Sequence, residues 1–142
     1  MDTPILIAII SAATGLTASA LTFFLTKKKE HQAEWRKQKL DAYKELLGAM
    51  SAVAERQPTS DAKNNFAHTV NYILLVGAPP VLVGLRALLD EIADSNSSKS
   101  DDRHDKLLTE LMYAIRDDLG IRPNRADGGY QFRLWAATKK PK

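Results

Sequence analysis

The feature that most constrains this chain is a long stretch without charge near its N-terminus. No charged residue occurs between Ile5 and Thr26, a run of 22 residues. A helix of about 20 apolar residues spans the hydrocarbon core of a bilayer, where only a helix or a closed barrel satisfies its own backbone. The sequence therefore predicts a transmembrane anchor over residues 1–26, with the membrane-spanning helix at 5–25.

A block of lysines follows the uncharged run and sets its orientation. Lys27, Lys28 and Lys29 come directly after the run, whereas the residues before it carry one acidic group. Under the positive-inside rule, this difference places the N-terminus outside and the rest of the chain in the cytoplasm. The three lysines are also candidates for contact with the membrane surface.

A cleaved signal peptide is the alternative interpretation of the same run. Ala18-Ser19-Ala20 matches a small-residue cleavage site. However, no Lys or Arg precedes the run, and its apolar character continues past that site. The anchor is therefore favoured.

Small residues recur every four positions within the predicted span, at Ser11, Gly15 and Ser19. This spacing lets two helix backbones approach closely, so these residues are candidates for a helix–helix interface. The alternative is that small residues are common in any moderately hydrophobic span.

Residues 27–55 contain no Pro and are rich in Lys, Glu, Gln, Ala and Leu, which favour helix. We expect a long juxtamembrane helix that continues directly from the span. Apolar residues spaced three and four apart form a heptad seam, and Leu46 and Val53 widen it. A widened stripe suits a helical bundle better than a two-stranded coiled coil. The seam consists of Leu40, Tyr43, Leu47, Met50 and Ala54.

Three further amphipathic segments follow a break at residues 57–61. They predict helices at 61–76, 81–93 and 103–119. Residues 69–76 are rich in β-branched and aromatic side chains and also fit a strand, but no partner strand is evident, so helix is favoured. The predicted fold is all-α: a transmembrane helix, a long juxtamembrane helix and a small cytoplasmic helical bundle within residues 27–120.

The C-terminal tail, residues 121–142, is basic, with six Lys or Arg and one Asp. It either folds back as an extended segment on the bundle, or stays free to contact anionic lipid, a protein partner or nucleic acid. The basic residues lie at the two ends of the cytoplasmic part, while its middle, residues 57–120, is acidic overall. This distribution argues against a dedicated nucleic-acid domain.

No group of residues with a catalytic or metal-binding pattern is apparent. The chain has no Cys, and its histidines, His31, His68 and His104, fall on different predicted elements. Asp117 and Asp118 are adjacent, so on a helix they point about 100° apart and do not share one site. Phosphate-binding and nucleophile motifs are missing as well. The sequence therefore predicts no catalytic, cofactor or metal site and indicates no small-molecule substrate.

Two motifs, Glu34-Trp35-Arg36-Lys37-Gln38-Lys39 and Arg116-Asp117-Asp118-Leu119-Gly120, give the chain a family resemblance. It resembles small, uncharacterised bacterial inner-membrane proteins that have one N-terminal span, a Trp-containing juxtamembrane helix and a cytoplasmic helical domain. The resemblance implies a bacterial inner-membrane setting and no particular activity. Physically, Arg116 with Asp117 or Asp118 is expected to form an ion pair between helices.

These features together predict a membrane-anchored, non-enzymatic helical scaffold or interaction protein. Its expected partners are the lipid bilayer and either a second copy of the chain or another membrane protein. One alternative is an accessory subunit that docks an enzyme or transporter at the inner membrane. A second alternative is a membrane-bound enzyme of unrecognised class.

Overall fold

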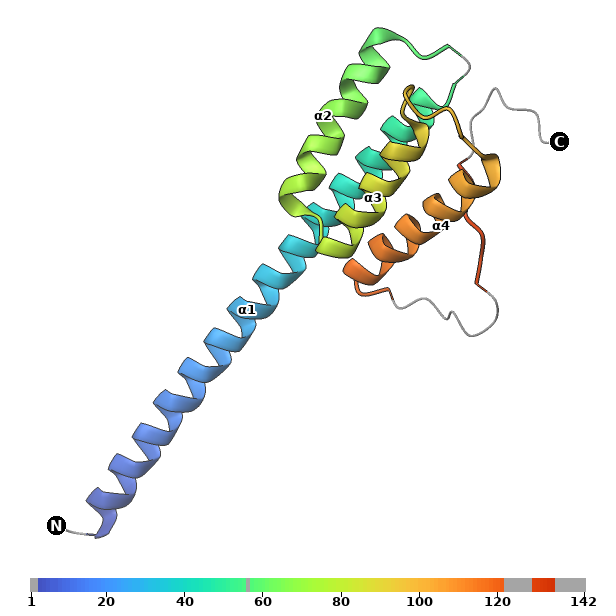
Figure 1. Ribbon diagram of the computed structural model, residues 1–142. Helices are drawn as coiled ribbons and strands as arrows, with labels where there is room; N and C mark the ends of the chain where they lie inside the picture. Colours follow the sequence, from blue (N-terminus) through green and yellow to red (C-terminus); the bar gives the residue numbers. More distant parts are fainter. Residues whose placement is uncertain (1–2, 56, 122–128, 135–142) are drawn as a thin grey trace. The chain divides into compact units, whose positions relative to one another are not determined.

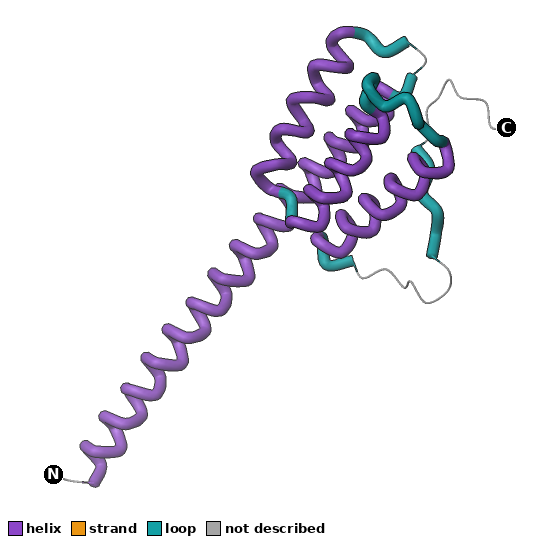
Figure 2. The backbone as a smooth tube through the Cα atoms, in the orientation of Figure 1, coloured by secondary structure: helices purple, strands orange, loops and turns teal. Residues whose placement is uncertain are grey.

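The fold is known from a computed structural model that describes residues 3–55, 57–121 and 129–134 (Figure 1). Within these residues all regular structure is helical and no strand occurs (Figure 2). The all-α prediction is thus confirmed, and residues 69–76 form helix rather than strand. The four helices are α1 (Thr3–Val53), α2 (Ser60–Val76), α3 (Pro79–Ile92) and α4 (Asp101–Asp118).

The chain divides into two compact units, Met1–Lys37 and Gln38–Lys142. The division falls inside α1, so the single long helix predicted through the juxtamembrane region is present without a break. The second unit holds the end of α1, all of α2 to α4 and the described part of the tail. The domain boundaries predicted after residues 26 and 120 stay predictions.

The predicted membrane anchor lies in the first unit, where the described side chains of α1 are exposed. A search of the described residues for a helix both long and apolar enough to cross a membrane finds none. The side chains of Leu6, Ala8, Ile9 and Ile10 lie outside the described residues. The transmembrane helix is therefore not supported by the described part of the chain and stays a prediction.

The core of the second unit combines apolar side chains from all four helices. Its fully buried members include Tyr43 and Leu46 from α1, Ile73 from α2, Leu85 from α3 and Leu111 from α4. Because α1, from the first half of the sequence, and α4, from the second half, both contribute to this core, it fixes the arrangement of the bundle.

The buried stripe of α1 differs from the predicted heptad seam. Tyr43 and Met50 are buried as expected, and Leu47 packs against the core. However, the most deeply buried residue of α1 is Leu46, with 0% of its surface exposed, which lies beside the predicted seam. Leu40 is 38% exposed, and Ala54 is also exposed. Ala54 lies beyond Val53, the last residue of α1. On an undistorted helix of 3.6 residues per turn, a strict seven-residue repeat drifts about 20° per heptad, which moves Leu40 toward the edge of the buried face.

The packing of α3 on α4 depends on a glycine. A Cβ atom at Gly84 would lie 3.3 Å from the Cα of Leu111, which is tighter than ordinary van der Waals contact. Leu85 and Leu88 on one side of α3 and Leu108 and Leu111 on α4 are all buried around this point. The small residue thus lets the two helix backbones approach closely.

A Schellman motif ends α4 at Gly120. Gly120 has φ of 74°, a left-handed conformation that favours glycine. Its N–H donates to the carbonyl of Asp117 at 2.9 Å, and the N–H of Ile121 donates to that of Arg116 at 2.7 Å. This sharp stop leaves Asp118 in the last turn of the helix, where it contacts α1.

Candidate functional site

Three features of the second unit combine polar groups in a way that could carry function. Two are carboxylates that are largely removed from solvent. Glu91 lies near the end of α3 and contacts the start of α4, and Asp118 lies in the last turn of α4. The third is an extended segment, residues 129–134, that lies along α4.

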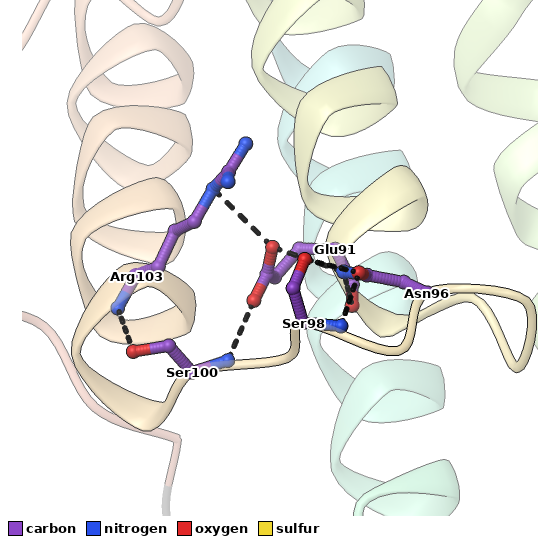
Figure 3. Close-up of polar contacts among 5 residues, drawn as sticks. All are labelled: Glu91, Asn96, Ser98, Ser100 and Arg103. Atoms are coloured by element: carbon purple, nitrogen blue, oxygen red, sulfur yellow. Dashed lines mark hydrogen bonds and ion pairs between the residues drawn. The ribbon is translucent and has the colours of Figure 1, made fainter.

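Glu91 is 3% exposed, at the end of α3, and it organises the loop that leads to α4 (Figure 3). Its Oε1 accepts a hydrogen bond from the backbone N–H of Ser100 at 2.9 Å. Its Oε2 accepts from the side-chain amide of Asn96 at 3.2 Å and lies 3.3 Å from Nε of Arg103. Three donors thus surround one carboxylate, so both of its oxygens have partners in the structure.

The loop itself is built on Asn96. Its side-chain amide also donates to the backbone carbonyl of Glu91 at 3.0 Å, while its Oδ1 accepts from both the N–H and the hydroxyl of Ser98 (Figure 3). Ser100 then caps α4, since its hydroxyl accepts from the N–H of Arg103. Asn and Ser side chains stabilise a turn because they form hydrogen bonds with backbone groups that have no backbone partner there. The polar loop is therefore an ordered connection rather than a free one.

A cavity of about 400 Å³ lies against this cluster. Its polar lining groups are already engaged with one another: Glu91 with Arg103, and Asn96 with Ser98. The Glu91 carboxylate has three donors, so the hydrogen bonds assign it to holding the loop and α4 together rather than to proton transfer. The lining residues are Ala87, Asp90, Glu91, Asn96, Ser98, Arg103 and Leu107.

The second carboxylate, Asp118, joins α4 to α1. Its Oδ1 lies 2.7 Å from Nζ of Lys39, and its Oδ2 accepts a hydrogen bond from the Tyr43 hydroxyl at 2.5 Å. The side chains of Lys39 and Asp118 are 14% and 10% exposed. An ion pair between helices is thus present at Asp118, but its partner is Lys39 and not the predicted Arg116.

Tyr43 is held neutral in this cluster. Burial, followed by the hydrogen bond to Asp118 and its negative charge, raises the pKa of the Tyr43 hydroxyl well above its ordinary value. A tyrosine with a raised pKa donates its proton poorly to a reaction at neutral pH. The Lys39–Tyr43–Asp118 cluster is therefore suited to fixing α1 against α4. Removing one partner of such a buried pair costs about 3–5 kcal/mol.

The third feature is the docked segment, residues 129–134, which lies along α4 in an extended conformation. The Tyr113 hydroxyl accepts from the N–H of Tyr130 at 2.6 Å and donates to its carbonyl at 3.1 Å. The Thr109 hydroxyl accepts from the N–H of Phe132 at 3.0 Å and lies 3.5 Å from its carbonyl. Thr109 and Tyr113, one turn apart on α4, thus form hydrogen bonds with the backbone of every second residue of the segment.

Side chains of the segment complete the contact. The Phe132 ring meets the Tyr113 ring edge to face at a centroid distance of 5.4 Å, and Nε of Arg133 lies 3.1 Å from Asp105. Leu134 packs against the core. Of the two interpretations of the tail, folding back is therefore confirmed for residues 129–134, whereas 122–128 and 135–142 lie outside the described residues.

The docked segment is held weakly. Each neutral hydrogen bond adds about 0.5–1.5 kcal/mol net, and an exposed ion pair adds about 0–1 kcal/mol. Ordering six residues of backbone costs about 6–12 kcal/mol, which is more than these polar contacts supply, so the packing of Phe132 and Leu134 must supply the difference. The contact is thus specific in geometry but near balance in free energy.

The structure places the predicted site residues in separate regions. Ser11, Gly15 and Ser19 are exposed, and a Cβ atom at Gly15 would meet nothing within 4 Å, so their role as a helix–helix interface stays a prediction. Lys28 and Lys29 are exposed, as is Lys27.

Lys27 is engaged within its own helix. Its ammonium lies 2.9 Å from Glu30, and this hydrogen bond raises the pKa of Lys27. The positive charge of the block is therefore partly balanced one turn further along α1. The proposed contact of the three lysines with a membrane surface stays a prediction.

The histidines occupy unrelated positions. His68 is exposed, and Nδ1 of His104 lies 3.4 Å from the single carboxylate of Asp105. Within the described ranges, no group of three or more potential metal-ligating side chains occurs.

Sequence reasoning missed Glu91, although a signal was present. Val81, Leu85 and Leu88 lie on the core face of α3 at spacings of four and three, and Glu91 continues this register. A carboxylate at a core position must find donors, which here come from the following polar loop.

Comparison of the chain with protein-family models, with curated proteins and with solved structures yields no match. The resemblance to small inner-membrane proteins therefore stays a prediction.

Proposed function

We propose that this protein is a membrane-anchored helical interaction module that works by binding other proteins and not by catalysis. Residues 5–25 cross the cell inner membrane, with the N-terminus outside and the helical bundle in the cytoplasm. The observation that carries the proposal is the uncharged run from Ile5 to Thr26 followed directly by Lys27, Lys28 and Lys29.

The side chains of α1 support an apolar surrounding for this run. Large apolar residues of this run are 51–73% exposed, which is costly in water and favourable in lipid. The hydroxyls of Thr17, Ser19 and Thr22 donate to carbonyls of their own helix at 2.8–3.1 Å, so they need no water. The exposed apolar residues are Ile5, Ile7, Leu16, Leu21, Phe23, Phe24 and Leu25.

Two properties of the bundle favour binding over catalysis. Glu91 and Asp118 are both engaged in contacts that hold helices and loops together. In addition, Leu74, Leu75 and Val83 are 57%, 80% and 71% exposed on the bundle surface. Exposed apolar side chains of this size are typical of surfaces that contact other proteins. An accessory subunit that docks an enzyme or transporter is the alternative, and the identity of the partner separates the two roles.

The anchor is tested by membrane extraction. The wild-type chain should stay with membranes after alkaline carbonate treatment, whereas the Leu16→Arg, Leu21→Arg double variant should be released, because each buried Arg costs about 2.5–3.5 kcal/mol in a span. Gln32→Arg with Gln38→Arg adds the same charge outside the run and should stay with the membrane. Equal extraction of both double variants would reject the anchor.

Orientation is tested with single cysteines, since the chain has none of its own. Thr3→Cys should react with a membrane-impermeant maleimide in spheroplasts with intact inner membranes. Ser98→Cys, in the exposed part of the α3–α4 loop, should react only after lysis. The reverse pattern would overturn the proposed topology.

The interaction role is tested by crosslinking in intact membranes, followed by mild detergent extraction and mass spectrometry. Links between copies alone indicate a homo-oligomeric scaffold. A foreign protein in stoichiometric yield indicates an accessory subunit. A chain recovered without any crosslinked protein would contradict both roles.

A further inference from the structure

The end of the second unit where α2 turns into α3 exposes a group of apolar side chains. Residues 69–85 contain no charged residue and cover the last turns of α2 and the first turns of α3. Within them Leu74, Leu75 and Val83 are 57%, 80% and 71% exposed, so much of this surface is both apolar and open. The exposed apolar residues of this end, which we name the α2–α3 tip, are Leu74, Leu75, Pro79, Pro80 and Val83.

The first turn of α3 leaves no N–H group without a partner. The first four N–H groups of a helix usually have no partner within the helix. Here Pro79 and Pro80 have no N–H at all. The next two N–H groups, of Val81 and Leu82, donate to the carbonyl of Ala78 at 2.9 and 3.1 Å. This helix start therefore needs neither water nor a polar side chain to satisfy its N–H groups.

The other two helices that begin in the second unit are capped differently. At the start of α2 the Thr59 hydroxyl accepts from the N–H of Ala62 at 3.1 Å. At the start of α4 the Ser100 hydroxyl accepts from the N–H of Arg103 at 3.5 Å. The N-cap of α3 is Ala78, which makes no side-chain hydrogen bond. Only the start of α3 is thus suited to surroundings without water, where an unpaired polar group is costly.

The tip lies at the end of the second unit where α1 enters it (Figure 1). The Tyr43 hydroxyl of α1 contacts both the backbone of Ala78, beside the tip, and Asp118 in the last turn of α4. Since α1 is one helix from Thr3 to Val53, this is also the end through which the chain leads back to the uncharged run.

The opposite end of the unit, where α3 leads into α4, is acidic. Residues 93–102 carry the exposed side chains of Asp94, Asp101 and Asp102 and a single cation, Lys99. A bilayer surface with anionic lipids repels such an end and does not repel an uncharged one. Charge therefore favours an approach to lipid with the tip rather than with the loop.

We propose that the α2–α3 tip enters the lipid interface of the bilayer that holds the uncharged run. The proposal rests on the anchor proposed above and adds a second contact with the same membrane. Lipid is favoured over protein as the occupant because protein interfaces carry about one hydrogen bond per 100–200 Å². The tip side chains, all Leu, Pro or Val, have no hydrogen-bonding group.

The bilayer is within reach of the tip. Residues 27–37 join the uncharged run to the second unit, and as a helix they span about 16 Å. The headgroup region extends about 5–7 Å beyond the hydrocarbon core, and spanning helices tilt by up to about 40°. A short connection also keeps the bilayer surface at a high effective concentration, so a weak apolar contact suffices.

The test uses single cysteines, since the chain has none of its own. The full-length chain with Leu75→Cys carries an environment-sensitive nitrobenzoxadiazole label. It is reconstituted in vesicles of phosphatidylcholine and phosphatidylglycerol, with and without lipid that bears a nitroxide just below its headgroup. Lys63→Cys, exposed near the start of the same helix, is the matched control. We expect the nitroxide to lower the emission at position 75 about twofold and that at position 63 by less than about a tenth.

A second set of variants tests the apolar side chains. Leu74→Gln with Val83→Gln, added to the Leu75→Cys chain, should lower the quenching to the level of the control. Leu74→Met with Val83→Ile keeps the tip apolar and should retain the quenching. Circular dichroism of each variant shows that the helices remain.

Two results would overturn the contact with lipid. A label at position 75 that aqueous iodide quenches as strongly as the label at position 63, and that the nitroxide does not quench, would show that the tip lies in water. A label shielded from both quenchers would show that a protein covers the tip. Flotation of the same vesicles separates these results from failure of the anchor, because a chain that does not float with the lipid has lost both the anchor and the contact.

Discussion

Glu91 and Asp118 are two carboxylates largely withdrawn from solvent near opposite ends of α4, and they obtain their partners in different ways. Glu91 binds Asn96, Ser100 and Arg103, all within the next twelve positions of the chain. Asp118 binds Lys39 and Tyr43, which are 79 and 75 positions away. The first contact orders a loop, whereas the second holds the last turn of α4 against α1. The same chemical group thus serves local order in one place and tertiary arrangement in the other.

The largest effect is expected at the long-range cluster. Asp118→Ala leaves the ammonium of Lys39 without its carboxylate partner at a site that is 14% exposed, so the free energy of unfolding should fall by about 3 kcal/mol. Urea unfolding followed by circular dichroism measures the loss. Asp117→Ala changes the exposed neighbour and should cost no more than about 0.5 kcal/mol. Similar losses for the two variants would show that the Lys39 pair does not hold the helices.

A smaller and more local effect is expected at Glu91. Glu91→Ala leaves the N–H of Ser100 without an acceptor and removes one of the two acceptors of the Asn96 amide, which keeps the backbone carbonyl at position 91; the loss should be about 2 kcal/mol. Amide hydrogen exchange should rise in residues 94–100 and remain unchanged in α1. Asp90→Ala removes an exposed carboxylate paired with Arg86 and should cost about 0.5 kcal/mol. Faster exchange spread equally over α1 would remove the distinction between the two carboxylates.

The dependence of stability on alkaline pH measures the contribution of the Tyr43 hydroxyl, which binds Asp118. The pKa of Tyr43 is raised in the folded state, so its contribution to stability is complete below the ordinary tyrosine pKa of 10.0 and is lost as the pH rises above it. Between about pH 9 and about pH 11, the wild type should lose about 1 kcal/mol more than Tyr43→Phe, which cannot ionise there. Urea unfolding at each pH gives the comparison, and parallel curves for both proteins would contradict it.

The smallest effect is expected in the loop beyond Glu91. Ser98→Ala removes one hydroxyl donor to Asn96 but keeps the backbone N–H bond at 3.0 Å, so stability should fall by about 0.5 kcal/mol. Thermal unfolding compared with the neighbouring variant Ser97→Ala measures it. A loss as large as that of Glu91→Ala would mean that Asn96, rather than Glu91, organises the loop.

Much of the fold follows from local pattern. Thr59 and Ser100 cap α2 and α4, Pro79 begins α3, and Gly77 and Gly120 end α2 and α4. These signals act within one turn of the chain, so their physical effect is readable from neighbouring residues. For residues 69–76 the sequence favoured helix over strand, and the structure shows that they belong to α2.

The residues of the candidate sites were harder to predict from signals between neighbouring residues. An ion pair between helices was expected at Asp117 or Asp118, but with Arg116 as the partner, whereas Asp118 pairs with Lys39. The heptad seam placed Leu40 and Ala54 inside, whereas both are exposed and Leu46 is central. Which face of a helix is buried, and which charges meet, depends on neighbours that are distant in sequence.

The sequence by itself determined the helices, their ends and the unusual uncharged run at residues 5–26, because propensity, capping and charge act over a few residues. Only the tertiary structure decided that Asp118 meets Lys39 and Tyr43, that Glu91 lies in the core and orders the loop after it, and that residues 129–134 lie along α4. These contacts join segments whose meeting depends on the whole core, and no local signal fixes them.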